Sequence, residues 1–301
     1  MSVKNEAYKY LSSCKSIMVY ELHIHANAPV LFVDGSYYVF HRYFATLRWF
    51  SLRSFNDLSK SEQEEKIQGI HTDHDFMNAF KKHIGQDVKK WRKTWNVPHG
   101  NIVFGFDCTR GDIWRHAFHD GYKSTRTASA SFNGNIFPAF YTWFEENQES
   151  LGLQCVEGSN LEADDVIYLG IQQLRSLQPQ IPIIVMTNDN DYLQIKDDGI
   201  TLINAQYKDI VQRSSVGNAQ HDLLIKILMG DVSDNIPSVA PKLGAVTARK
   251  IAEQGRAYAE SWAEAKGVLE RFKRNELLIS FAHIPSDIAS RYNLKYKWVM
   301  V

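Results

Sequence analysis

Nine carboxylates, gathered in five short clusters, constrain this chain more than any other feature of its sequence. Three of the clusters lie at or just past the end of a short apolar run that is typical of a buried strand. If these strands are parallel, their carboxyl ends share one edge of the sheet, where α/β proteins build their sites. The carboxylates belong to Asp34, Asp107, Glu162, Asp164, Asp165, Asp189, Asp191, Asp231 and Asp234.

So many acids cannot converge as bare charges. At about 4 Å, two like charges repel by roughly 4 kcal/mol even at an effective dielectric constant of about 20. A hard divalent cation removes this penalty, and Mg²⁺ and Mn²⁺ prefer oxygen ligands of this kind. The pattern therefore predicts a divalent-metal site, most simply a two-metal site for phosphodiester chemistry.

Each cluster also has a plain structural explanation when it is taken alone. Ser159 and Glu162 fit a capping box at the start of a helix, where Asp164 is favoured by the helix dipole. The acids of TNDND and MGDVSDN fit Asx turns or helix caps, and Asp34 before Gly35 fits a turn. Their joint occurrence at strand ends is what favours the metal site.

Composition is that of a globular chain, and its charge distribution favours a nucleic-acid partner. The 301 residues suggest about two domains, and the net charge is zero. If nine of the 34 acidic residues lie at a metal site, the rest of the protein is net basic, as a phosphate-backbone binder should be. Basic stretches occur at 81–93 and 242–274, although each can also be a solvated helix face.

The sequence contains no pattern that predicts a membrane span, a secretory signal or a transit peptide. No apolar stretch approaches the ~20 residues that a membrane span needs. The first 29 residues lack a secretory signal and carry two acids and no arginine, which also argues against a transit peptide. Three cysteines, odd in number and far apart, predict reduced thiols in a cytosol-like compartment.

Hydrophobic periodicity predicts strand–helix alternation followed by an all-helical end. An amphipathic helix over 76–95 has Phe76, Phe80, Ile84, Val88 and Trp91 on one stripe. Beyond residue 220 the patterns are helical only, and residues 51–75 are polar without a clear period. This order predicts an α/β fold, a parallel-sheet domain followed by a small helical module. Strands are expected at 30–34, 102–107, 153–158, 181–189 and 199–206, with further helices at 36–50, 136–149 and 161–177.

The polar and basic segment 108–135 is too long for an ordinary connection, so we expect a functional loop there. It carries Arg115, Tyr122, Lys123 and Arg126. Lysine and arginine beside a metal cluster can offset phosphate charge in a transition state. A disordered basic loop is the alternative, and the histidine pairs here and at 71–74 are expected to be surface residues.

Taken together, LEADDVIY, TNDNDYLQI and MGDVSDNIPSV followed by TARKIAE resemble the 5′-nuclease family. More narrowly, they are similar to the flap endonucleases and 5′→3′ exonucleases of bacteria and bacteriophages. The resemblance runs from about Val30 to Gly255. It implies a PIN-like α/β domain with a helical arch, two divalent metal ions, and a helix–three-turn–helix module that grips duplex DNA.

Site residues follow from this resemblance. It implies a first metal near Asp34, Asp107, Glu162, Asp164 and Asp165 and a second near Asp189, Asp191, Asp231 and Asp234. The ions would be Mg²⁺, with Mn²⁺ as a substitute. Lys123 and Arg126 match the catalytic lysine and arginine at the base of the arch.

DNA contacts are implied in the same way. Tyr122 matches an aromatic position that can stack on a base, and Arg42 and Arg115 are candidate phosphate contacts. In the helical module, backbone amides, Lys242, Gly244, Lys250 and a K⁺ ion would hold duplex phosphates. The module's hairpin departs from the family pattern, because only Gly244 of the usual glycines is present and Pro241 lies in the turn.

The resemblance also implies a domain plan. We expect an N-terminal extension at 1–29, a PIN-like catalytic domain at 30–215, a DNA-binding module at 216–280 and a C-terminal tail at 281–301. Residues 51–75 are interpreted as an insertion. No polymerase domain follows in the sequence, so a stand-alone nuclease is expected.

The function predicted is a structure-specific 5′-nuclease that acts on 5′ ends and 5′ flaps of DNA in replication or repair, with RNA primers as a further candidate substrate. Its partner would be DNA with a flap or a single-strand/duplex junction, or an RNA–DNA hybrid. We expect a monomer in the cytoplasm of a bacterial or phage-infected cell. A junction-binding protein with weak catalysis and a PIN-like ribonuclease remain the alternatives.

Overall fold

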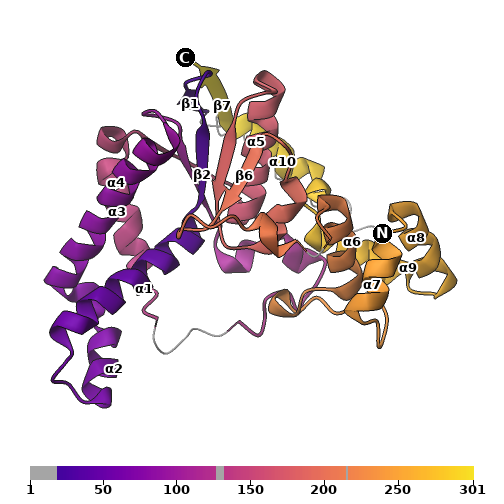
Figure 1. Cartoon of the computed structure of the whole chain (residues 1–301), viewed down its shortest axis with the longest axis horizontal. Coiled ribbons are helices and arrows are strands. Elements are labelled where there is room, and N and C mark those ends of the chain that lie inside the picture. The colour runs from indigo at the N-terminus through magenta and orange to yellow at the C-terminus, as the bar shows by residue number, and fades with distance from the viewer. Residues whose placement is uncertain (1–18, 127–131, 215) are drawn as a thin grey trace, which may run out of the picture.

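A five-stranded parallel sheet forms the centre of the protein (Figure 1), as predicted. The computed structural model describes residues 19–126, 132–214 and 216–301. The strand order β4-β3-β2-β5-β6 places β2 in the middle, with the chain first winding to one side of β2 and then to the other. A crevice at the carboxyl end of β2 is therefore the expected place for a site. The strands are β2 (Val30–Asp34), β3 (Ile102–Phe106), β4 (Leu153–Glu157), β5 (Ile183–Met186) and β6 (Ile200–Ile203).

Helices cover both faces of this sheet, because β2 and β3 are buried along their whole length and present apolar side chains to either side. Leu31 and Val33 pack against one helical layer, and Val30 and Phe32 pack against the other. The predicted stripe of the helix at 76–95 is buried in the first layer. That layer contains α1 (Gly35–Ser54), α3 (His74–Trp95) and α4 (Ile136–Leu151), and the second contains α5 (Ala163–Leu177) and α10 (Ser286–Lys295).

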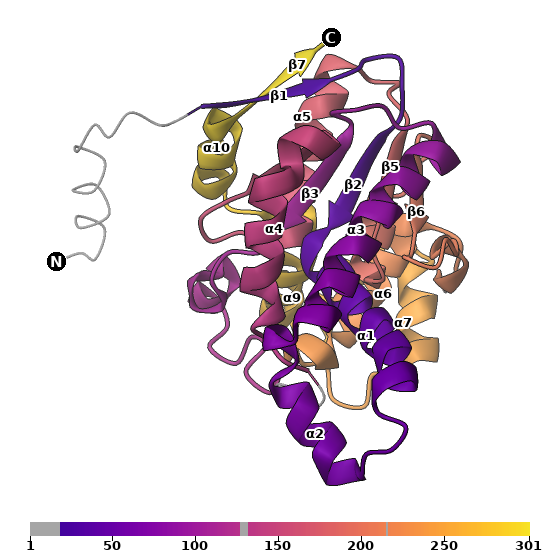
Figure 2. The same cartoon turned by 90° about the vertical axis from the view of Figure 1, so that its left-hand side faces the viewer.

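The two ends of the described chain pair with each other, which the sequence did not indicate. β1 (Tyr20–Ile24) and β7 (Tyr296–Met300) form a two-stranded parallel sheet at the end of the molecule opposite α2 (Figure 2). Tyr292 and Trp298 from the predicted tail at 281–301 are buried in the core beneath α5. This segment is thus part of the α/β body, because its aromatic side chains complete that core. Of the predicted extension, residues 1–18 lie outside the described residues.

The all-helical module predicted after residue 220 is present and has a core of its own. Ile113 and Tyr122, from the long loop after β3, are buried in this core together with Leu228 and Phe272. The loop therefore ties the module to the sheet domain. The helices are α6 (Ala219–Met229), α7 (Ala245–Ala252), α8 (Arg256–Ala265) and α9 (Leu269–Ile279).

Two segments differ from the expected pattern. Within 51–75, α1 continues to Ser54, and α2 (Lys60–Gln68) begins with a capping box between Ser59 and Glu62. The segment 108–135 contains two short 3₁₀ helices, Arg110–Asp112 and Trp114–Ala117, while 127–131, in the predicted arch, lies outside the described residues. Among the helices of the described chain, none combines the length and apolar character needed to cross a bilayer.

Candidate metal centre

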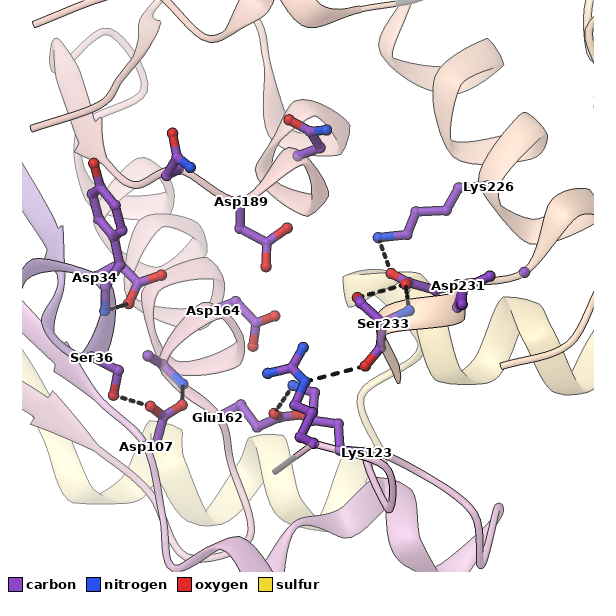
Figure 3. A pocket seen from close by; sticks show the side chains of 17 residues that line it. Asp34, Ser36, Asp107, Lys123, Glu162, Asp164, Asp189, Lys226, Asp231 and Ser233 are labelled. Atoms are coloured by element: carbon purple, nitrogen blue, oxygen red, sulfur yellow. Dashed lines mark hydrogen bonds and ion pairs between the residues drawn. The ribbon is translucent and has the colours of Figure 1, made fainter. Parts of the chain in front are cut away.

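Carboxylates from four separate segments meet in a cavity of about 700 Å³ at the carboxyl end of the sheet (Figure 3). The segments are the end of β2, the residue after β3, the start of α5 and the loop after β5, and the turn before α7 adds a further acid. Parallel strands bring residues far apart in sequence to this edge, as predicted. Six of the predicted metal ligands line the cavity, namely Asp34, Asp107, Glu162, Asp164, Asp189 and Asp231.

Local backbone structure fixes the carboxylates nearest the sheet. Asp34 caps α1 and accepts a hydrogen bond from the Tyr37 backbone N–H at 3.0 Å. Asp107 accepts hydrogen bonds from the Ser36 hydroxyl and from the Ala163 backbone N–H, the latter at 2.7 Å. A Cβ atom at Gly35 would lie 2.5 Å from Phe106, so glycine is needed where α1 starts against β3.

Four of the nine carboxylates, which we call the unpaired set, have no ion pair within the described residues: Asp34, Asp107, Asp164 and Asp189. Burial, then repulsion from Asp107, raises the pKa of Asp34 to about 7. Burial likewise raises the pKa of Asp107. Burial and then the neighbouring Asp165 raise the pKa of Asp164 well above its usual range. All four line the cavity, so it gathers acidic groups that have no ion-pair partner within the described residues.

The other five, which we call the paired set, each contact a basic side chain: Glu162, Asp165, Asp191, Asp231 and Asp234. Burial would raise the pKa of Glu162, but Lys123 and Arg115 outweigh it and hold the pKa below its usual value. Burial would also raise the pKa of Asp231, but the ion pair with Lys226 outweighs it and lowers this pKa to about 2. The chain itself supplies the counter-charges here.

Asp165 and Arg115 form a buried pair behind the cavity. Arg115 is 2% exposed and donates to both oxygens of Asp165 at 2.7 Å, and Asp165 also accepts from the Trp114 indole N–H at 3.0 Å. The predicted contact of Arg115 with DNA is not supported by this geometry, because its guanidinium is buried in this ion pair. Oxygens of Glu162, Asp164 and Asp165 still lie within 4.8 Å of one another, although Asp165 does not line the cavity.

Lys226 is the site residue that sequence reasoning missed. It extends from α6 into the cavity, where its ammonium lies 2.8 Å from Asp231 (Figure 3). The same ammonium also contacts Asp191. The available signal was its place on a helix five residues before Asp231, but a single lysine in an amphipathic helix carries no specific pattern. Asp191 and Asp234, both predicted as ligands, do not line the cavity.

Lys123 and Arg126, the predicted catalytic pair, both reach the cavity from the long loop. Lys123 contacts Glu162 and lies 3.7 Å from Asp234, and Arg126 lies 2.5 Å from Asp234. Lys123 has a φ of 53°, a left-handed conformation that is rare for lysine. Loop and acidic turn are thus joined by ion pairs that hold both basic side chains at the cavity.

Tyr122 is not exposed, as stacking on a base would require. It is 3% exposed, and its hydroxyl donates to Glu162 at 2.8 Å and to Asp234 at 3.2 Å. The predicted stacking of Tyr122 on a base is not supported by this geometry, because its ring is buried in the core of the helical module.

Of the other predicted DNA contacts, Arg42 is held in an ion pair and the rest are exposed. Arg42 lies 2.5 Å from Asp87, which also accepts from the Tyr38 hydroxyl at 2.6 Å, and only 17% of its side chain is exposed. Its role as a phosphate contact is not supported by this geometry. Lys242, Gly244 and Lys250 lie on the surface of the helical module, away from the cavity, and Lys242 has a φ of 58° in the turn before α7.

The donor set fits hard divalent cations. It consists of carboxylate oxygens, which Mg²⁺ and Mn²⁺ prefer over sulfur or imidazole ligands. Burial and the neighbouring Asp107 and Asp189 raise the pKa of Asp34, which disfavours its charged form. Either protons or metal ions can neutralise these groups, and one divalent cation can be shared by several carboxylates.

Known proteins are similar to this chain in sequence and in fold. A family model of the 5'-3' exonuclease N-terminal resolvase-like domain matches residues 29–220. A 5'-3' exonuclease of Buchnera aphidicola subsp. Schizaphis graminum is 28% identical over 228 residues, which is 73% of this chain and 68% of that protein. A protein of Enterobacteria phage T4 named ribonuclease H is 26% identical over 245 residues, which is 75% of this chain and 77% of the relative.

A solved structure supports the same fold. The T5 D15 protein, co-crystallised with metal ions, superposes with a TM-score of 0.57 at 14% identity, over 88% of this chain and 96% of that one. At this identity the likeness concerns the fold alone. Because the family model covers more than half of the 301 residues, this chain belongs to the 5'-3' exonuclease family.

Proposed function

We propose that this protein is a metal-dependent 5′-nuclease that hydrolyses phosphodiester bonds at 5′ ends and 5′ flaps of DNA. The observation that carries the proposal is the cavity itself, where the four carboxylates of the unpaired set converge beside Lys123, Arg126 and Lys226. Family membership supports the reaction class, since relatives are named 5'-3' exonucleases.

Two Mg²⁺ ions, or Mn²⁺ in their place, are proposed to bind in this cavity. The unpaired set together with Glu162 and Asp231 would hold them, because these are the carboxylates that line it. Bound divalent ions supply an activated water at neutral pH and stabilise both the attacking and the leaving oxygens. Asp191 and Asp234 would act through Lys226, Lys123 and Arg126, which they hold in place.

The basic side chains are proposed to bind the scissile phosphate. Lys123 and Arg126 extend from one side of the cavity and Lys226 from another, so their charges surround the space in front of the carboxylates. Charge placed where it develops in the transition state contributes to rate more than to ground-state binding. We therefore expect Lys123→Ala to lower kcat by about 10²-fold with a smaller effect on KM.

Substrate choice is proposed to depend on the helical module. Lys242, Gly244 and Lys250 form an exposed surface around the start of α7, suited to duplex phosphates, with K⁺ as a candidate aid. The T4 relative is named ribonuclease H, which favours testing an RNA strand paired with DNA as a second substrate. The protein is proposed to act as a monomer.

Cleavage of a 5′-labelled flap duplex is the direct test of this proposal. Cleavage near the junction in Mg²⁺, lost with EDTA and in Asp189→Asn, is the expected result. The same assay on a nicked duplex, on an RNA–DNA hybrid and on single-stranded RNA separates a DNA flap nuclease from a ribonuclease. Binding of the flap duplex without cleavage in either Mg²⁺ or Mn²⁺ would contradict the nuclease proposal and leave a junction-binding protein.

A further inference from the structure

A second cavity, of about 770 Å³, lies between β1, the C-terminal half of α4 and β4. We call it the edge groove, because β4 is an edge strand of the central sheet. Its volume falls in the range of ligand-binding pockets. Aromatic rings provide much of its apolar lining, from Tyr20, Phe106, Tyr141, Phe144 and Tyr296. The groove touches the metal centre only at Asp107, and the proposed reaction uses none of its other residues.

The groove is strongly acidic. Glu21 and Glu157 line it and are neutralised by Lys297 at 2.7 Å and by Lys295 at 3.2 Å. Glu145 and Glu149 also line it, one helical turn apart on α4, and within the described residues neither has an ion pair. Two like charges at this spacing repel each other. The groove therefore has both apolar walls and uncompensated negative charge.

This combination determines what kind of occupant fits. A nucleic acid is excluded, because its phosphates would be repelled by Glu145 and Glu149. A small apolar molecule would leave the two charges uncompensated. A peptide segment that carries both lysines and aromatic or aliphatic side chains would satisfy the charges and the apolar walls together.

The chain's own first 18 residues have this chemistry. They contain Lys4, Lys9 and Lys15 against Glu6 as their one acid, together with aromatic and aliphatic residues that include Tyr8, Tyr10, Leu11 and Ile17. They join the described chain at Val19, directly before Tyr20, which lines the groove. We propose that residues 1–18 bind in the edge groove of the same chain, with lysines opposite Glu145 and Glu149.

Tethering favours this occupant over a separate partner. Because the segment starts at the groove, its effective concentration there is on the order of millimolar, so weak contacts suffice. Eighteen extended residues span roughly 60 Å, so no part of the groove is out of reach. Glu145 and Glu149 are exposed, so their contacts with lysines are screened and the binding should weaken as salt concentration rises.

The intact protein allows a direct test of the position of the segment. Cys14 lies within it, while Cys108 and Cys155 are the remaining cysteines. In a Cys108→Ser, Cys155→Ser variant, a benzophenone maleimide attached to Cys14 should form photo-crosslinks that map by mass spectrometry to residues 141–157 and 295–296. Crosslinks spread over the whole surface, or absent from these residues, would overturn the proposal.

A second experiment tests the charge chemistry with a matched control. A fluorescein-labelled peptide of residues 1–18 is titrated with protein lacking those residues, and fluorescence anisotropy is measured. Glu149→Lys should weaken binding roughly tenfold, because an attraction becomes a repulsion. Glu146→Lys makes the same change of charge on an exposed part of α4 outside the groove and should leave affinity within about twofold.

The full-length protein completes this test. Its groove should already be occupied, so the peptide should bind it much more weakly than it binds the truncated protein. Equal binding to both, or equal loss in the two lysine variants, would overturn the proposal. Light scattering distinguishes a segment that binds a second copy, since the full-length protein would then be dimeric and the truncated one monomeric, which would also contradict binding within one chain.

Discussion

The unpaired and paired sets of carboxylates lie at the same site yet differ in what balances their charge. Asp34 in the unpaired set has a pKa raised to about 7, whereas Asp231 in the paired set has a pKa lowered to about 2. Burial raises the pKa of both groups, and Asp34 is the more deeply buried of the two. They differ also in their charged neighbours, because Lys226 contacts Asp231, whereas the charged groups that act on Asp34 are Asp107 and Asp189. Residue type alone therefore does not show which carboxylates need a cation from outside the chain; the absence of a basic partner does.

Asp164 is a better carboxylate than Asp165 for testing catalysis. Asp164 and Asp165 are adjacent in sequence, but Asp164 lines the cavity and Asp165 is fully buried against Arg115. Sequence alone does not separate them, because both follow Glu162 in the first turn of α5. We therefore expect substitution of Asp164 to reduce cleavage and substitution of Asp165 to reduce stability.

The largest effect is expected for Asp164→Asn. Removing one charge from the unpaired set takes away a metal ligand, and cleavage should fall by about 10³-fold. Folding should be unaffected or improved without metal, because repulsion among the carboxylates is reduced. Single-turnover cleavage of a flap substrate and urea unfolding of the metal-free protein measure the two quantities. Wild-type cleavage by this variant would remove Asp164 from the site.

The adjacent substitution, Asp165→Asn, should act on stability instead. It leaves the buried Arg115 guanidinium without its bidentate partner, at a cost of about 3–5 kcal/mol in the free energy of unfolding. Urea unfolding in EDTA isolates this effect from metal binding. If Asp165→Asn unfolds like the wild type but loses Mg²⁺ binding in calorimetry, Asp165 belongs with the metal ligands and the division into two sets is wrong.

Stability as a function of pH tests the unpaired set in another way. The pKa of Asp34 is raised in the folded state from 3.8 to about 7, so the folded protein holds a proton that the unfolded chain releases. Stability from this group is therefore present below pH 4 and is lost as pH rises toward 7. At 1.36 kcal/mol for each pH unit the loss is at most about 4 kcal/mol, and we expect roughly 2 kcal/mol after relaxation.

Asp34→Asn provides the control for this titration. The metal-free variant should lose less stability between pH 5.5 and pH 8 than the wild type does, because the group that titrates is gone. In the wild type, Mg²⁺ should raise the Tm more at pH 8 than at pH 5.5, since bound metal replaces the proton. An equal Mg²⁺ effect at both pH values would indicate that Asp34 is already ionised at pH 5.5.

Much of this molecule could be predicted from the sequence because its signals are local. Strands β2 to β6 are short apolar runs, and the acids follow them at positions that a parallel sheet brings together. The pairing of β1 with β7 could not be predicted, because it joins Tyr20 to Tyr296 across nearly the whole chain. The buried contacts of Arg115 and Tyr122 could not be predicted either, because basic and aromatic residues in a polar loop are typical of an exposed segment.

Lys226 is the clearest case of information that only the folded chain holds, and it gives the smallest expected effect. Its ammonium contacts Asp191 and Asp231, where the resemblance predicted a second metal, so a lysine and a divalent ion would compete for the same oxygens.

Lys226→Met keeps most of the side-chain volume and removes the charge, so calorimetry should show Mg²⁺ binding about tenfold tighter. The KM for a flap substrate should rise, because a phosphate contact is lost. Lys250→Met, on the exposed surface of the helical module, removes an equal charge away from the cavity and should leave Mg²⁺ affinity unchanged. Weaker Mg²⁺ binding in Lys226→Met would show that the lysine orients the paired carboxylates for metal rather than competing with it, and the two sets would then act as one ligand group.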